Sequence, residues 1–388
     1  MYIALLGRQP ALGMAELERL YGEEATSWFS DVSAKIAIDD GFSIEKLGGV
    51  QKAGQVVIEL PSGDWRRVSM KIVQAYTHAW SGFEGKITLG ISAYGFDVSP
   101  REIQQTGIIL KQKLKKANVS LRMIPNSDTA LNTATSHHNK LGLSNNKVEL
   151  LVVRARNGRV IIAESTGAQN ITAYTKRDQE RPKRDAFVGM LPPKLAQIMI
   201  NLADPTPHSR VLDPFCGTGV VLQEAALLGH SVYGTDLSEK MIRYSKENLD
   251  WLKETHRTTF EYDLHEGDAM DTSWQGPIDA VVGETYLGQP FSAPPSPAKL
   301  DQVRGNCNNI ISAFLKNLGS QLPSGTSVSI AIPAWKRIDG GFVHLPLINQ
   351  LDQLGFTRHS FKNIKDQELL YFREDQVVAR ELLVLVKA

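Results

Sequence analysis

Apolar residues follow two different spacings along the chain, and these spacings predict its strands and helices. Short apolar runs at residues 2–6 and 87–94 are typical of buried strands. Apolar residues three or four positions apart indicate helices over residues 12–21 and 101–117. Beyond residue 190, strands alternate with helices, which predicts a doubly wound sheet. We therefore expect an α/β protein with an α+β N-terminal region.

The order of these elements divides the chain into four predicted parts. A chain of 388 residues is too long for one ordinary core, so two or three domains are expected. The predicted parts are a ferredoxin-like α+β domain over residues 1–80, a second α+β domain over 81–170, a polar and proline-broken linker over 171–190, and an α/β domain with a mixed seven-stranded sheet over 191–388.

Residues 211–219 are the most informative stretch of the last part. An apolar strand runs into the turn Asp213 to Gly219, with the sequence DPFCGTG, and a helix follows. Two glycines two residues apart let the backbone approach a ligand closely. The dinucleotide fingerprint would need a third glycine where Val221 and Leu222 stand, and no Gly-Lys-Ser/Thr phosphate loop is present. The turn therefore favours a nucleotide without a tightly held pyrophosphate.

An acidic residue closes the next predicted strand. Asp236 follows the strand over residues 231–235 and comes about twenty residues after the glycine turn. An acid at this spacing is placed to accept hydrogen bonds from both ribose hydroxyls of a nucleoside. A further apolar run at residues 278–282 should be a central, buried strand of the same sheet.

Charge is unevenly distributed, although the whole chain carries only +1. The net charge is −2 over residues 1–80, +8 over 81–190 and −5 over 191–388. A basic part beside an acidic one is typical of a protein that binds a phosphate backbone with one part and carries out chemistry with another. Solvated lysines and the dipole of a helix C-terminus would explain the same cations, so that alternative stays open. The candidates for phosphate contacts are Lys111, Lys113, Lys115 and Lys116 at the end of one helix, and Arg177, Arg181, Lys183 and Arg184 in the linker.

Composition argues against several other classes of protein. Apolar residues make up 42% of the chain and charged residues 22%, and no apolar run reaches the length of about eighteen residues that a membrane span needs. The N-terminus has no positive region or cleavage site of a signal peptide, so export is not expected. Cys216 and Cys307 form neither a disulfide framework nor a zinc spacing. We therefore expect a cytoplasmic protein without a metal ion.

The DPFCGTG string, together with Gly234-Thr235-Asp236, resembles S-adenosylmethionine-dependent methyltransferases that modify exocyclic amino groups. The likeness is strongest to tRNA guanine-N2 methyltransferases that carry a THUMP domain, an RNA-binding module. The order of elements over residues 81–170, and residues 131–141 in particular, is similar to a THUMP domain. The resemblance implies a Rossmann-like methyltransferase domain over residues 191–388, S-adenosylmethionine as the cofactor and tRNA as the partner.

The same resemblance implies roles for residues around the turn. In the family, an acid in the position of Asp268 binds the exocyclic amine of the cofactor's adenine, and the next residue, here Ala269, packs beside the ring. The expected cofactor-binding residues are Asp213, Cys216, Gly217, Thr218, Gly219, Asp236, Leu237, Asp268 and Ala269.

The catalytic motif departs from the family pattern. There, the fourth strand runs into Asp-Pro-Pro-Tyr-Gly or a close variant, whose acid or amide accepts hydrogen bonds from the target amine while the aromatic ring stacks on the base. Here Glu284 replaces the acid, Thr285 and Tyr286 replace the prolines, and Leu287 takes the aromatic place. A glutamate side chain is longer than aspartate by one methylene group, roughly 1.5 Å, whereas a catalytic group must be placed to within about 0.5 Å. We still expect Glu284, Thr285 and Tyr286 to form the catalytic site.

These features predict methyl transfer to the exocyclic N2 of a guanine in tRNA. The base would leave its stack and enter a pocket over Glu284 and Tyr286. Two alternatives stay open: an RNA-binding protein whose methyltransferase domain has lost activity, and an adenine-N6 or DNA amino-methyltransferase. The basic middle of the chain favours RNA, and the intact cofactor turn favours an active enzyme.

Overall fold

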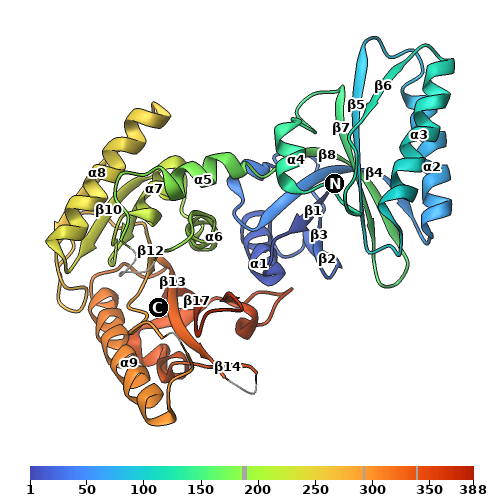
Figure 1. Ribbon diagram of the computed structural model, residues 1–388. Coiled ribbons are helices and arrows are strands. Elements are labelled where there is room, and N and C mark those ends of the chain that lie inside the picture. Colours follow the sequence, from blue (N-terminus) through green and yellow to red (C-terminus); the bar gives the residue numbers. More distant parts are fainter. Residues whose placement is uncertain (186–189, 292, 338–339) are drawn as a thin grey trace. The chain divides into compact units, whose positions relative to one another are not determined.

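The structure is a computed structural model that describes residues 1–185, 190–291, 293–337 and 340–388. The chain forms two compact units. Unit 1 comprises Met1–Met14 and Tyr21–Ala173, and unit 2 comprises Ala15–Leu20 and Tyr174–Ala388. Each unit contains a large sheet with helices packed against it (Figure 1). The predicted α/β class with an α+β N-terminal region is therefore confirmed.

Unit 1 is built on one eight-stranded sheet with the order β2-β3-β1-β4-β8-β7-β5-β6. Neighbouring strands are antiparallel, except that β5 is parallel to both β6 and β7. The strands are β1 (Tyr2–Leu6), β2 (Thr26–Ser30), β3 (Ser33–Ile36), β4 (Val50–Leu60), β5 (Lys86–Tyr94), β6 (Ser120–Met123), β7 (Lys147–Arg154) and β8 (Val160–Ala168). The helices are α1 (Pro10–Tyr21), whose residues are divided between the units, α2 (Trp65–Ala79), α3 (Pro100–Lys116) and α4 (Thr133–His138), with a 3-10 turn at Ile44–Lys46.

The core of unit 1 crosses the domain boundary that the sequence predicts at residue 80. Tyr76 and Trp80 pack in one cluster with Ile87 and Leu89 of β5. Strand β4 also pairs along its length with β8, which lies more than a hundred residues later in the chain. Residues 1–80 and 81–170 thus share a sheet and a core. Local periodicity could not reveal this, because it does not record which distant strands pair.

Helix α3 carries the four lysines that the sequence analysis singled out. Its start is fixed by a capping box: Glu102 N donates to Ser99 Oγ at 3.3 Å, and Ser99 N donates to Glu102 Oε2 at 2.9 Å. Leu110 and Leu114 are buried on its inner face, and α3 lies side by side with α2 in the first unit (Figure 1). The predicted helix over residues 101–117 is confirmed, and its lysines are left on the outer face.

Unit 2 is built on a mixed sheet whose main path has seven strands, in the order β11-β10-β9-β12-β13-β17-β15. The first five are parallel to one another, and β17 is antiparallel to both β13 and β15. The strands are β9 (Arg210–Asp213), β10 (Ser231–Asp236), β11 (Tyr262–Glu266), β12 (Ala280–Glu284), β13 (Ser327–Lys336), β14 (Phe342–Val343), β15 (Phe356–Arg358), β16 (Leu370–Tyr371) and β17 (Val378–Lys387). The helices are α5 (Ile171–Gln179), whose first three residues belong to unit 1, α6 (Pro193–Ala203), α7 (Val220–Leu227), α8 (Glu239–His256) and α9 (Pro297–Gly319).

The strand order of unit 2 reverses between β9 and β12. From β9 the chain moves outward through β10 and β11, and it then returns to place β12 and β13 on the other side of β9. In open α/β sheets, ligands bind in the crevice that such a reversal opens at the carboxyl ends of the strands. The turn DPFCGTG and the motif around Glu284 follow these two strands, so the fold brings them to one edge.

Residues 347–354 carry apolar residues that suggest a last helix, but they do not form an α-helix in the structure. Two 3-10 turns, Pro346–Gln350 and Asp352–Leu354, take its place, and a third follows at Asp366–Glu368. Gly355 then reverses the chain with a φ of +84°.

None of the helices among the described residues is both long and apolar enough to cross a membrane.

Candidate active site

The turn between β9 and α7 has a backbone that only glycine adopts easily at two positions. Gly217 has a φ of +52° and Gly219 a φ of +80°. A Cβ at Gly219 would come within 2.9 Å of Ser245 Oγ, and that hydroxyl donates to Gly217 O at 2.8 Å. The glycines predicted from the sequence are thus needed both for backbone conformation and for close packing against α8.

Asp236 ends β10 and holds the turn from the neighbouring strand. Its Oδ2 accepts from Gly217 N at 2.9 Å, and its Oδ1 accepts from Ser238 N at 2.9 Å. Burial raises the pKa of this carboxyl, while the two backbone N–H groups act in the opposite direction. Each oxygen retains a lone pair, so the side chain can accept further hydrogen bonds from a ligand.

Asp213 is the most deeply buried carboxyl of the site, with 2% of its surface exposed. Burial raises its pKa well above the ordinary range, the hydrogen bond from Phe215 N lowers it, and the nearby charges of Asp236 and Glu284 raise it further. Oδ1 accepts that hydrogen bond at 3.1 Å. Three carboxyl groups therefore crowd one edge of the sheet, which favours a cationic ligand there.

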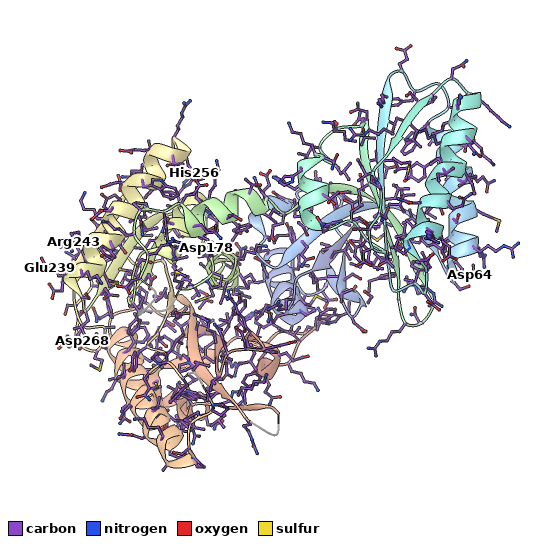
Figure 2. All side chains as sticks on the ribbon, viewed as in Figure 1. Asp64, Asp178, Glu239, Arg243, His256 and Asp268 are labelled. Carbon is purple, nitrogen blue, oxygen red and sulfur yellow. The ribbon has the colours of Figure 1, made fainter. Side chains whose placement is uncertain are left out.

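Asp268 and Ala269 follow β11 on the same side of unit 2. Asp268 Oδ1 accepts from Met270 N at 2.9 Å, and Ala269 is buried. Asp268 comes two residues after the end of β11, so it lies at the carboxyl edge of the sheet, and Figure 2 labels it together with Glu239 at the start of α8.

A cavity of about 510 Å³ lies at this edge. Its lining comes from the turn after β9 and from the ends of β10, β11 and β12. Of the predicted cofactor-binding residues, those that line it are Asp213, Cys216, Gly217, Thr218, Asp236, Leu237, Asp268 and Ala269, and the predicted catalytic residues that line it are Glu284, Thr285 and Tyr286. Gly219 is set back from the cavity at the start of α7. Leu191, Met270 and Ile310 also line it, although no sequence pattern singled them out.

The motif after β12 places three different side chains at the cavity. Glu284 accepts a hydrogen bond from Arg380 of β17 in an ion pair. Thr285 is buried, and its Oγ1 donates to Ala331 O at 3.0 Å, so its hydroxyl is used within the fold. Tyr286 is 45% exposed and lines the cavity. Sequence reasoning missed Arg380, because nothing near it in the chain marks it as a partner of Glu284.

The predicted phosphate-binding residues of the linker separate into buried and accessible side chains. Arg177 is buried and forms a two-point ion pair with Glu224, with Nε to Oε1 at 2.6 Å and Nη2 to Oε2 at 3.0 Å. Arg181 is 3% exposed. Both arginines pack inside unit 2, which leaves little of either side chain accessible for the phosphate contacts that the sequence analysis expects. Lys183 is half-buried and pairs with Glu247 at 3.2 Å, and Arg184 is exposed.

Lys183 also joins the linker to the glycine turn through its backbone. Asn248, which is fully buried in α8, accepts from Lys183 N at 2.9 Å. The Asn248 amide donates both to Lys183 O at 2.9 Å and to Thr218 O at 2.8 Å. Residues 186–189 of the predicted linker lie outside the described part of the chain. The sequence analysis did not single out Asn248, since an asparagine inside a helix pattern carries no local sign of this role.

The four lysines of α3 are all exposed: Lys111, Lys113, Lys115 and Lys116. They belong to unit 1, and their positions on the last turns of the helix leave the ammonium groups accessible to solvent. Among the described residues, no group of three or more His, Cys, Asp or Glu side chains is arranged to hold a metal ion.

Comparison with known proteins shows that most of the cavity lining lies in a segment similar to a methyltransferase domain. Residues 181–285 match the family described as "RMKL-like, methyltransferase domain". A tRNA (guanine(10)-N2)-dimethyltransferase of Methanothermobacter thermautotrophicus is 32% identical over 158 residues, which cover 40% of this chain and 43% of the relative. A tRNA (guanine(6)-N2)-methyltransferase of Thermus thermophilus is 43% identical over 76 residues, which cover 18% of this chain and 23% of that protein. The matched parts thus span less than half of these relatives.

One solved structure is similar over the whole chain. The crystal structure of TrmN from Thermus thermophilus covers 100% of this chain and 99% of its own, with a TM-score of 0.52 and 18% sequence identity. At this identity the likeness shows a shared fold. A methyltransferase domain is thus supported by the match over residues 181–285, and the THUMP resemblance of residues 81–170 stays a prediction.

Proposed function

We propose that this chain, which carries a methyltransferase domain of the RMKL-like family, transfers a methyl group from S-adenosylmethionine to the exocyclic N2 of a guanine in tRNA. The proposal rests on one observation, which is that the glycine turn, Asp236, Asp268 and Glu284 all line the same cavity. The names of the matched relatives support guanine N2 as the acceptor. We expect the reaction to take place in the cytoplasm.

The cavity fits S-adenosylmethionine in its chemistry. This cofactor supplies a methyl group on a positively charged sulfur. Asp236 would accept hydrogen bonds from the ribose hydroxyls, and Asp268 would accept from the adenine amine. The crowded carboxyl groups of Asp213, Asp236 and Glu284 complement a cation, because a positive charge relieves their mutual repulsion. The backbone of Gly217 and Thr218, which carries no bulky side chain at the first position, allows close approach.

Glu284 and Tyr286 would receive the acceptor base. A neutral aryl amine needs little general-base help, so the chief task is to place it in line with the methyl group. The Glu284 carboxylate would accept a hydrogen bond from N2–H and stabilise the positive charge that develops on nitrogen. The exposed ring of Tyr286 would stack on a guanine taken out of its helix. Thr285 would support the loop through its bond to β13 and not contact the base.

Unit 1 would supply most of the contacts to the tRNA backbone. The net charge of +8 over residues 81–190 and the exposed lysines at the end of α3 support this assignment. Phosphate contacts of this kind orient a nucleic acid without reading its sequence. The choice of nucleotide would then rest with the cavity of unit 2.

Loss of the usual Asp-Pro-Pro-Tyr motif favours a second candidate, an RNA-binding protein without methyltransferase activity. One experiment separates the two. Purified full-length protein is incubated with unmodified tRNA and methyl-labelled S-adenosylmethionine. The tRNA is then digested to nucleosides, and the methylated nucleosides are identified by mass spectrometry. We expect N2-methylguanosine or its dimethyl form. Binding of both tRNA and cofactor without any labelled nucleoside would instead support the inactive protein, and label in N6-methyladenosine would move the acceptor to adenine.

A further inference from the structure

Arg380 is a buried cation that pairs with Glu284 of the proposed site, and no sequence motif points to it. It lies in β17, in register with Pro333 of β13. Glu284 ends β12, in register with Ala331 of the same strand β13. Strand β13 therefore lies between the two charged residues, and their side chains meet across it.

The register explains how this contact is possible. Residues directly opposite each other in a sheet project from the same face, and so do residues two apart in one strand. Glu284, Ala331 and Arg380 consequently share a face. Neighbouring strands are roughly 4.8 Å apart, so β12 and β17 are separated by about twice that distance. The side chains of Glu284 and Arg380 are long enough to span this gap, and the small side chain of Ala331 does not block their contact.

This geometry gives a reason for glutamate at position 284. An aspartate would be shorter by one carbon–carbon bond, about 1.5 Å, and would withdraw its carboxylate from Arg380. The extra methylene, which departs from the family motif, is matched here by a partner that the motif does not contain. The substitution and the arginine therefore form one arrangement.

Burial gives the pair its rigidity. The Glu284 and Arg380 side chains are 14% and 10% exposed, and Glu284 Oε1 accepts the hydrogen bond from Arg380 Nε. A guanidinium stays protonated and is planar, so it fixes the orientation of a carboxylate more strictly than a lysine does. Glu284 lines the cavity, whereas Arg380 stands behind it and does not line it. Arg380 also supplies a positive charge beside a carboxyl cluster that otherwise contains Asp213 and Asp236.

We propose that Arg380 is a positioning residue, which holds one oxygen of Glu284 so that the other faces the acceptor amine. This inference rests on the proposed methyl transfer. Arg380 would act only through Glu284 and would contact neither the cofactor nor the base. Its removal should therefore slow the reaction without weakening cofactor binding.

The test is a double-mutant cycle in the full-length protein, with kcat for tRNA methylation, the Kd for S-adenosylmethionine and the melting temperature measured for each variant. We expect Arg380→Gln to lower kcat by about 10- to 100-fold, the scale of a small misplacement of a catalytic group, with a cofactor Kd within about twofold of wild type. Arg380→Lys should recover part of the rate. The double variant Glu284→Gln, Arg380→Gln should be no slower than Glu284→Gln alone, because Arg380 has no effect once the carboxylate is gone.

A matched control is present in the same strand. Glu381 is buried on the opposite face of β17, where its Oε2 pairs with His344 Nδ1 at 2.6 Å. Glu381→Gln breaks a comparable pair and should leave kcat unchanged. If Arg380→Gln proves unstable, the comparison of Glu284→Gln with the uncharged double variant still decides the question.

Three results would overturn the inference. An unchanged kcat in Arg380→Gln would leave the arginine a purely structural role. If Arg380→Gln lowered kcat of the Glu284→Gln protein by the same factor as it lowers kcat of the wild type, Arg380 would act independently of Glu284. Absence of methyl transfer in the wild-type protein would refute the proposed function itself and this inference with it, whereas an active wild type with insensitive Arg380 variants would refute this inference alone.

Discussion

Asp213, Asp236 and Asp268 lie at the ends of neighbouring strands, but their surroundings differ. Asp213 is enclosed by protein and accepts one backbone hydrogen bond, whereas Asp236 accepts two and Asp268 lies after β11 beside the cavity. The same side chain is therefore suited to different tasks at each position. At the scale of single residues, this difference leads to two predictions.

Asp236→Ala should weaken binding of S-adenosylmethionine by about 1.5 to 3 kcal/mol, which is the cost of losing hydrogen bonds to a charged acceptor. Titration calorimetry of the full-length protein measures this directly. Asp263→Ala is the control, since Asp263 lies on the adjacent strand β11, pairs with Arg210 and does not line the cavity. Wild-type affinity in Asp236→Ala would remove Asp236 from the cofactor site.

Asp213→Asn should stabilise the protein without cofactor at neutral pH while weakening cofactor binding. The raised pKa of Asp213 means that the folded protein holds this proton more tightly than the unfolded chain. The stability that protonation contributes is complete below the ordinary carboxyl pKa and is lost as the pH rises through the raised value. Asparagine keeps the shape and the acceptor for Phe215 N, and it has no charge to bury. We expect a gain of about 1 to 3 kcal/mol near pH 7.

The gain should shrink as the pH falls towards the ordinary carboxyl range, where Asp213 is neutral in both states. Thermal unfolding of the two proteins between pH 4 and about pH 8 tests this. An asparagine variant that is equally destabilised at every pH would show that the shape of the site, and not the buried charge, dominates.

At the scale of elements, α3 combines a structural and a charged face. Its inner side packs in the core of unit 1, and its start is held by the capping box of Ser99 and Glu102. Neither feature involves the exposed lysines, so the charge of the helix can be changed without loss of the fold. Surface substitutions of this kind usually change stability by less than about 0.5 kcal/mol.

Replacement of all four lysines of α3 by glutamine should weaken tRNA binding and lower its dependence on salt. Each phosphate contact contributes a slope of about −0.7 to −0.9 in log K against log salt, so the loss of four contacts would lower the slope by about 3. The matched control replaces the same lysines by arginine, which keeps the charge. A glutamine variant with the wild-type affinity and slope would assign these lysines to solvated surface, the alternative that the charge pattern left open.

At the scale of the whole molecule, the net charge is positive in unit 1 and negative in unit 2. The basic residues 81–190 fall largely in unit 1, and the acidic residues 191–388 fall in unit 2 with the cavity. The two units can thus bind two ligands of different chemistry. The binding affinities for the two ligands should therefore depend differently on ionic strength.

The affinity of the full-length protein for tRNA should fall steeply as salt rises, by roughly 10³- to 10⁵-fold between 50 and 200 mM if six to ten phosphates are contacted. The affinity for S-adenosylmethionine should change little, because this cofactor has no phosphate groups and its binding releases no condensed counterions. Parallel titrations at several salt concentrations measure both. Equal salt dependence of the two ligands would argue against separate sites.

The sequence by itself determined those features whose cause is local. The glycine turn, the acid that ends β10 and the capped helix α3 depend on a few neighbouring residues, since backbone conformation and hydrogen bonds within a turn are set over that range. The alternation of strands and helices beyond residue 190 also predicted the sheet of unit 2, because a repeated local pattern leaves few topologies.

Only the tertiary structure decided what distant residues do to one another. The shared core on either side of residue 80 follows from the pairing of β4 with β8, and the burial of Arg177 follows from the position of Glu224 on α7. The pairing of Glu284 with Arg380 depends on the order of β12, β13 and β17 and on their register. A side chain's partner across a sheet is set by the packing of the whole unit, and no spacing along the chain records it.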